Sequence, residues 1–188
     1  MTVDDAGVDD PGTGHVDAFY ERRPGHAHTF TVAPSWSLYQ GLELGAVVSR
    51  DRSAGATSQA LQVKWLVTPS RTAGCNTGVT AALAHTRGVG NTPTINGLLT
   101  CNSGWGASHV NLGGVRNPGG PVLGTWGIAH EREFGPVTAH VEAFGQRHGK
   151  PTFQVGARTQ LTDTLQLDGS LGRSGGETLF SVGVVLQF

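Results

Sequence analysis

Leu179-Phe-Ser-Val-Gly-Val-Val-Leu-Gln-Phe188, the last ten residues of the chain, is the stretch that decides the fold. Every second side chain from Phe180 to Phe188 is large and apolar, whereas Ser181, Gly183 and Gln187 occupy alternate positions. A period of two residues is typical of a β-strand with one apolar face. An aromatic residue at the end of a soluble strand would lie in water, but a lipid-facing strand can place it at the membrane interface. The stretch therefore predicts a membrane-spanning strand.

The composition permits a membrane β-barrel and argues against other classes of protein. The 188 residues include 29 glycines, with 14% charged and 37% hydrophobic residues and a formal net charge of −1. No run of eighteen apolar residues exists, which excludes a transmembrane helix. The small net charge and the lack of a basic patch give no support for a nucleic-acid partner. The start, Met1-Thr-Val-Asp-Asp5, does not resemble a signal peptide, so we expect a mature form with an added initiator Met.

Short alternating segments recur along the chain, separated by Gly, Pro, Asn, Asp and Ser. About twelve such segments, spaced by about fourteen residues, predict antiparallel strands joined by tight turns. We expect two parts: a flexible N-terminal lead of residues 1–14, and a single all-β, closed, up-and-down transmembrane barrel of residues 15–188. Pro34 predicts a bulge or irregularity in the second strand, because proline lacks a ladder donor. The predicted strands are 15–23, 27–39, 42–50, 57–69, 77–87, 92–102, 107–116, 123–134, 136–147, 151–162, 164–173 and 177–188.

The alternative fold for this pattern is a soluble β-sandwich or lipocalin-like barrel with its apolar face inward. Two observations favour the membrane barrel. An even number of strands places both chain ends at one side, as in bacterial outer-membrane barrels. Outward aromatic residues also gather at the strand ends, as membrane-interface belts require. The expected outer belt contains Tyr20, Phe30, Trp126, Phe153 and Phe180, and the periplasmic belt contains Trp36, Trp65, Phe134 and Phe188, beside Trp105 in a turn.

Cys75 and Cys101 are open to three interpretations: free thiols, part of a metal site, or one disulfide. A metal site needs more ligands than lie near them in the sequence. Cys75 precedes the fifth predicted strand and Cys101 lies near the end of the sixth, so an antiparallel hairpin would place them opposite each other. The bacterial periplasm is oxidising, and we therefore predict a Cys75–Cys101 disulfide.

The final strand resembles the C-terminal strand of bacterial outer-membrane β-barrels, and other motifs extend the resemblance over most of the chain. Those motifs are Asp4–Gly7, Pro11-Gly12, Val16–Arg22, His109–Gly113, Trp126–Glu131 and Glu142–Gly145. They resemble the small proteobacterial "transporter" or phenol-degradation meta-pathway-like barrels. The resemblance implies a bacterial outer-membrane protein with a transport role, in contact with a lipid bilayer or detergent. It implies recognition of the C-terminal strand by the barrel-assembly machinery, and it supplies no cofactor, metal or catalytic residue.

Small residues at inward positions, together with short connections, predict an open, water-filled lumen for ions and small solutes. The alternatives are that the glycines relieve crowding where strands bend, or that the acidic lead folds in and blocks the bore. These small residues are Gly45, Ala82, Ala84, Gly127, Ala129, Gly156, Ser170, Gly172, Ser181 and Gly183.

Charged inward residues cluster on the eighth to eleventh predicted strands. A salt-bridge network that ties Arg158 to Glu142 and Asp168 is the expected structural role, and the same wall would select ions. Acids outnumber Lys64 and Arg158 when Asp17, Glu21 and Glu43 are counted, which predicts a mild preference for cations. The predicted lumen and selectivity residues are Lys64, Glu131, Glu133, His140, Glu142, Arg158 and Asp168.

We predict a monomeric channel without enzymatic activity. A lipid hydrolase would need a lipid-facing serine beside a histidine. Ser108 and His109 are adjacent and point to opposite faces, while His85 and His130 have no serine two residues away. The alternative functions are a structural barrel with a closed lumen and, less favoured, a lipid-modifying enzyme.

Overall fold

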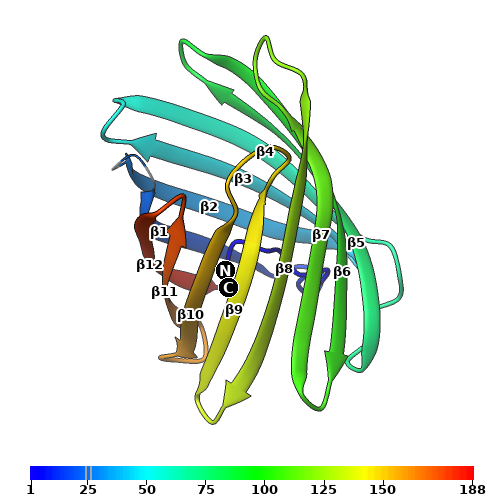
Figure 1. The fold of residues 1–188 in the computed structure, drawn as a ribbon. Helices are drawn as coiled ribbons and strands as arrows, with labels where there is room; N and C mark the ends of the chain where they lie inside the picture. Colours follow the sequence, from blue (N-terminus) through cyan, green and yellow to red (C-terminus); the bar gives the residue numbers. More distant parts are fainter. Residues whose placement is uncertain (24, 26) are drawn as a thin grey trace.

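The chain forms one closed antiparallel β-barrel (Figure 1). The structure, a computed structural model, describes residues 1–23, 25 and 27–188, and these contain twelve strands and no α-helix. No helix among them is long and apolar enough to cross a membrane. The strands are β1 (Gly14–Arg23), β2 (Ala27–Tyr39), β3 (Leu42–Asp51), β4 (Ala56–Leu66), β5 (Gly74–Thr86), β6 (Gly90–Ser103), β7 (Gly106–Arg116), β8 (Val122–Phe134), β9 (Val137–Gln146), β10 (Thr152–Gln160), β11 (Leu165–Ser174) and β12 (Glu177–Gln187).

Each strand pairs with its neighbours in sequence, and β1 closes the barrel by pairing with β12 from His15↔Gln187 to Arg22↔Phe180. The predicted number of strands and their order are therefore confirmed. Because consecutive strands alternate in direction, β1 begins and β12 ends at the same rim, which we call the near rim; the opposite one is the far rim. Two-residue turns at the near rim contain Gly41 and Gly135, whose φ angles of 82° and 63° suit tight hairpins.

The β2–β3 ladder is irregular, but not only where the sequence predicted. Pairing is interrupted between Val32↔Val48 and Ser35↔Gly45, around Pro34, without a change of register. The register shift lies nearer the end of the strand, between Ser37 and Tyr39. Proline thus removes part of a ladder, whereas the bulge forms beside the turn into β3.

The distribution of apolar and polar side chains is reversed relative to a soluble protein. Among the described residues, thirteen buried side chains are polar or charged and six are hydrophobic. Large apolar residues at mid-strand positions face outward instead; Leu61, for example, is 72% exposed. An apolar outer surface around a polar interior is the arrangement of a transmembrane barrel.

Aromatic side chains contact one another at both rims. The ring centroids of Tyr20 and Phe180 are 5.9 Å apart toward the far rim, and those of Trp36 and Phe188 are 5.7 Å apart at the near rim. Arg132 lies 5.5 Å from the ring centroids of Trp105 and Phe134. These positions agree with the expected belts, and the role of the rings at a lipid interface stays a prediction.

The predicted disulfide is confirmed. Cys75 and Cys101 are directly opposite each other in the β5–β6 ladder and form a bond, with their Cα atoms 4.0 Å apart. The bond closes a hairpin of 26 residues in sequence separation and lies near the near rim.

Substitution of an outward apolar residue tests the orientation of the wall. We expect Leu61→Arg to lower the free energy of unfolding in lipid vesicles by about 2–4 kcal/mol, because arginine at the bilayer midplane is poorly solvated. Val137→Arg, at the near-rim end of β9, is the matched control and should cost about 0–1 kcal/mol. Denaturant titration measures both, and equal costs for the two variants would contradict a lipid-facing band.

Candidate functional site

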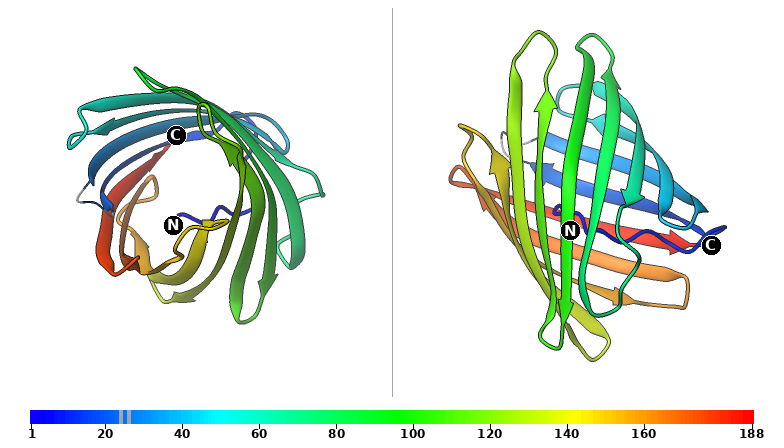
Figure 2. Two further views of the ribbon diagram at one scale, coloured as in Figure 1. Left: turned by 45° about the horizontal axis from the view of Figure 1, so that its top comes forward. Right: turned by 90° about the vertical axis from the view of Figure 1, so that its right-hand side faces the viewer.

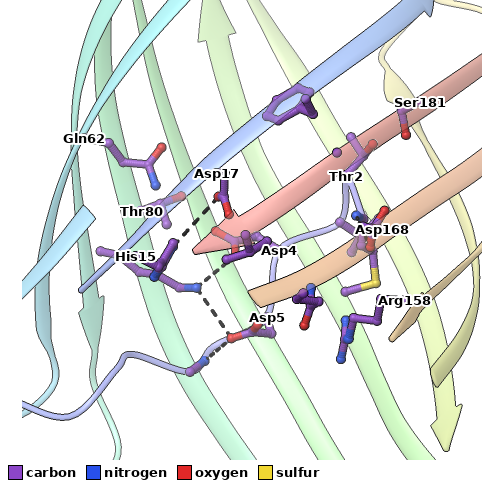
Figure 3. A pocket seen from close by; sticks show the side chains of 18 of the residues that line it. Thr2, Asp4, Asp5, His15, Asp17, Gln62, Thr80, Arg158, Asp168 and Ser181 are labelled. Carbon is purple, nitrogen blue, oxygen red and sulfur yellow. Dashed lines mark hydrogen bonds and ion pairs between the residues drawn. The ribbon is translucent and has the colours of Figure 1, made fainter. Parts of the chain in front are cut away.

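The bore contains a cavity of about 800 Å³ with a polar lining (Figure 3). Of the lumen residues expected from the sequence, Lys64, Arg158 and Asp168 line it. A second cavity, of about 480 Å³, is lined at the near rim by Glu131 and Glu133, and Arg158 borders both cavities. His140 and Glu142 are buried in the wall.

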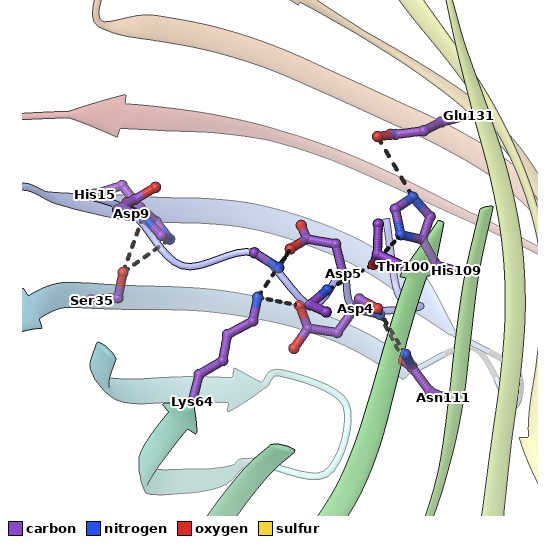
Figure 4. Close-up of polar contacts among 12 residues, drawn as sticks. Asp4, Asp5, Asp9, His15, Ser35, Lys64, Thr100, His109, Asn111 and Glu131 are labelled. Carbon is purple, nitrogen blue, oxygen red and sulfur yellow. Dashed lines mark hydrogen bonds and ion pairs between the residues drawn. The ribbon is translucent and has the colours of Figure 1, made fainter. Parts of the chain in front are cut away.

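The lead, whose residues 1–13 precede β1, lies inside the bore (Figure 2). Its backbone amides are hydrogen-bonded to side chains of the wall. Glu142 Oε2 accepts hydrogen bonds of 2.8 Å from the amides of both Thr2 and Val3. The amide of Asp4 donates to Asn111 Oδ1 at 2.8 Å, and Asn111 Nδ2 donates to the Asp4 carbonyl oxygen at 2.7 Å (Figure 4). An extended segment without a partner strand needs such bonds, because buried amides that lack acceptors are costly.

Two small apolar side chains of the lead fit against glycines of the wall. Val3 and Ala6 are 2% and 1% exposed. A Cβ atom at Gly127 would lie 2.9 Å from Val3 Cγ2, and a Cβ atom at Gly78 would lie 3.7 Å from the Ala6 Cβ atom. The Ala6 amide also donates to Thr100 Oγ1 at 2.8 Å. The division of the chain at residue 14 stays a prediction, but the contacts of the lead are specific.

Other small residues of the wall are opposite large inward side chains. A Cβ atom at Gly183 would lie 2.6 Å from Phe19 Cβ, one at Gly172 would lie 3.1 Å from Leu179 Cδ1, and one at Gly156 would overlap the His140 ring. The open lumen was the main expectation from these small residues, but neighbouring side chains and the lead occupy much of the space beside them, as the two alternatives described.

Lys64 connects the lead to β4. Its Nζ lies 2.9 Å from Asp4 Oδ1 and 3.5 Å from Asp5 Oδ1, and the residue is 9% exposed (Figure 4). The lysine was expected to face the lumen, and its side chain does so. Its acidic partners were missed, because they lie about sixty positions earlier in a segment that we expected to be flexible.

A second charged cluster joins β7, β8 and β10. Arg158 Nη2 lies 2.7 Å from Glu131 Oε2, and His109 Nε2 lies 3.6 Å from Glu131 Oε1. Thr100 Oγ1 is 2.9 Å from His109 Nδ1. Arg158 was expected to bind Glu142 and Asp168, and the pairing with Glu131 differs from that expectation. Glu142 instead accepts hydrogen bonds from the lead and lies 3.5 Å from His140 Nδ1.

The structure also brings together a serine and a histidine that sequence reasoning kept apart. Ser108 Oγ lies 3.0 Å from His130 Nδ1. The two residues are opposite each other in the β7–β8 ladder and lie on the outer face near the near rim. A search within one strand missed the pair, because the register between strands depends on the turn that joins them. Among the described side chains, no carboxylate or amide is hydrogen-bonded to His130 in the way that a catalytic triad requires.

A family model described as "Uncharacterised conserved protein UCP029691" matches residues 1–179. The chain belongs to this family. The match extends over the lead as well as eleven strands and the start of β12, so the lead is part of what the family shares. No curated protein matches the chain.

Solved structures with the same fold are outer-membrane barrels. A KdgM porin has a TM-score of 0.81 at 12% identity, covering 93% of this chain and 99% of the porin. The COG4313 outer membrane channel from Pseudomonas putida F1 has a TM-score of 0.72 at 11% identity, with 100% of both chains covered. Omp33 of Acinetobacter baumannii has a TM-score of 0.65 at 8% identity, covering 94% and 97%. These similarities establish the fold.

The docking of the lead is testable by cross-linking. We expect the double variant Ala6→Cys/Gly78→Cys to form a disulfide in the folded protein under mild oxidation, because a Cβ atom at position 78 lies 3.7 Å from Ala6 Cβ. Peptide mass spectrometry under non-reducing conditions measures the bond. Ala6→Cys/Ser181→Cys is the control, since β12 is five strands away from β5 around the barrel, and it should remain unlinked. Equal linkage in both variants would mean that the lead has no fixed position.

Proposed function

We propose that this protein is a bacterial outer-membrane channel through which ions and small polar solutes pass passively, with the lead as an occupant of the bore that limits the flow. The observation that carries the proposal is a closed barrel with an apolar outer surface around a polar cavity of about 800 Å³. The volume of this cavity is much larger than the space that a single buried water molecule needs. Its charged lining suits hydrated ions.

The similarity to porins and channels supports this role. The similarity to the COG4313 outer membrane channel extends over the whole chain. We propose that the finer resemblance to phenol-degradation meta-pathway-like barrels reflects a shared transport role. We further propose that the protein is monomeric and that the barrel-assembly machinery recognises its C-terminal strand.

The solute class follows from the charge of the lining. Seven carboxylates line the larger cavity, against three lysine or arginine side chains. One similar structure is a KdgM porin in complex with disordered oligogalacturonate, which is a polyanion. The acidic lining here disfavours polyanions and favours cations or neutral solutes. The acidic residues are Asp4, Asp5, Asp9, Asp17, Glu21, Glu43 and Asp168, and the basic residues are Arg23, Lys64 and Arg158.

We propose that the protein has no enzymatic activity. Ser108 and His130 form a pair, but a serine nucleophile also needs a group that orients the histidine and donors that stabilise an oxyanion. The outer-membrane phospholipase A of Escherichia coli shares the barrel architecture at 15% identity and a TM-score of 0.53, which concerns the fold alone.

Release of the lead should raise the conductance. In planar bilayers containing potassium chloride, we expect the wild-type protein to give small, stable current steps. Val3→Asp/Ala6→Asp should give steps several-fold larger, because buried, unpaired carboxylates at these two positions oppose docking.

The matched control is Pro11→Asp/Thr13→Asp, which adds the same charge to exposed positions of the lead and should conduct like the wild type. If the conductance rose equally in both double variants, the added negative charge alone would explain the effect. A folded barrel that never conducts, in wild-type or variant form, would favour the structural role with a closed lumen.

The selectivity of the channel gives an independent test. In a potassium chloride gradient, the reversal potential of the wild-type protein should indicate a mild preference for potassium over chloride, because carboxylates predominate in the bore. Arg158→Gln should increase this preference, since it removes a cation that borders both cavities. A reversal potential that favours chloride would contradict the proposed selectivity.

A further inference from the structure

Three potential metal ligands converge where the lead enters β1. Asp9 of the lead, His15 of β1 and Glu43 of β3 each offer a ligand atom, and these atoms all lie within 4.8 Å of one another. Asp9 Oδ2 is 2.7 Å from His15 Nδ1. The hydrogen bond to His15 lowers the pKa of the Asp9 carboxyl from its ordinary value. All three residues line the larger cavity, so an ion in the bore has access to them. Figure 4 shows Asp9 beside His15.

Glu43 supplies a second and independent observation. The residue is only 7% exposed, and its carboxylate has no hydrogen bond or ion pair among the described residues. Its cross-strand neighbour is Lys64, which would be its natural partner. The lysine ammonium instead lies on Asp4 and Asp5 of the lead. The Glu43 carboxylate borders the cavity and feels only the longer-range attraction of Lys64 and His15, so a bound cation would stabilise it further.

The type of ligand points to a particular class of cation. One imidazole and two carboxylates suit Zn²⁺ and similar divalent transition metals, whereas Ca²⁺ and Mg²⁺ prefer sites made of oxygen atoms. Zn²⁺ binds such ligands at about 2.0–2.2 Å. Because the three ligand atoms already lie within 4.8 Å of one another, small side-chain rotations would bring all three to that distance from one ion. A further donor lies beside the ring nitrogen that contacts Asp9, because Ser35 Oγ is 3.1 Å from His15 Nδ1.

We propose that Asp9, His15 and Glu43 form a binding site for Zn²⁺ or a similar divalent transition metal, and that the bound ion fastens the lead to the barrel wall. The ion takes the place of the proton between His15 and Asp9, and it neutralises Glu43. Asp9 belongs to the lead and the other two residues belong to the wall, so coordination is a cross-link between them. The metal site stands on its own geometry; the effect on conductance rests on the proposed channel function.

Metal binding to the full, untagged and metal-free protein in detergent tests the site. Competition between the protein and a chromophoric chelator for Zn²⁺ should reveal one site in the wild type. We expect Asp9→Asn and Glu43→Gln each to weaken this site by about tenfold or more. Asp9→Asn lies outside the strands, so it leaves the barrel intact. Asp10→Asn, the exposed neighbour in the lead, and His85→Asn, an exposed histidine elsewhere, are the controls and should bind like the wild type.

The outcomes separate the metal site from the channel. The proposal is overturned if the wild type does not bind Zn²⁺, or if Asp9→Asn and Glu43→Gln bind it as the wild type does. In planar bilayers, Zn²⁺ should reduce the wild-type conductance and leave Asp9→Asn unaffected. If Zn²⁺ binds through these residues but the conductance of an open channel does not change, the proposal that the ion attaches the lead to the wall is wrong. If the protein binds Zn²⁺ through these residues but never conducts, the metal site is supported and the proposed channel function is wrong.

Discussion

The pairing of β1 with β12 is the interaction on which the rest of the structure depends. In lipid, each unpaired amide or carbonyl group costs several kcal/mol, so a sheet with open edges cannot span a membrane. Eight residue pairs from His15↔Gln187 to Arg22↔Phe180 remove both edges at once. Gly14 and Phe188 extend the closure, because each amide donates to the other residue's carbonyl oxygen at 2.9 Å. With the ring closed, alternation along each strand divides the side chains between the bilayer and the bore.

Closure also creates an interior that has to be filled or solvated. Twelve strands enclose more space than their inward side chains occupy, and the lead takes up part of the remainder. Its fit depends on the absence of side chains at Gly78 and Gly127, opposite Ala6 and Val3. Gly127, which the sequence analysis counted toward an open lumen, therefore makes room for the lead, and Gly78, which it did not count, does the same.

The strands, their orientation and the disulfide were predictable, because each depends on local information. A period of two residues identifies a strand and its two faces, and a hairpin places Cys75 opposite Cys101. The contacts of the site were not predictable in this way. Val3 and Gly127 are more than a hundred residues apart, and nothing in the local sequence pairs them.

Register explains the remaining differences between sequence and structure. Ser108 meets His130 only because the β7–β8 ladder aligns them, and a shift of one residue would turn one of them into the lumen. Likewise, inward facing alone did not identify Glu131 as the partner of Arg158, since Glu142 and Asp168 also face inward. The sequence did contain one indication, the acidic residues of the lead, of which Asp4 and Asp5 pair with Lys64 of the wall.

Lys64 links the position of the lead to the state of the wall. On the barrel it is opposite Glu43, yet its ammonium lies on the lead. Departure of the lead would leave Lys64 without Asp4 and Asp5, and the nearest carboxylate across the ladder would then be Glu43. In the structure, the contacts of Lys64 with Asp4 and Asp5 thus join the position of the lead to the charge balance of the wall. A cation at Glu43 would satisfy that carboxylate without Lys64, and so it would favour the arrangement in which the lead stays bound.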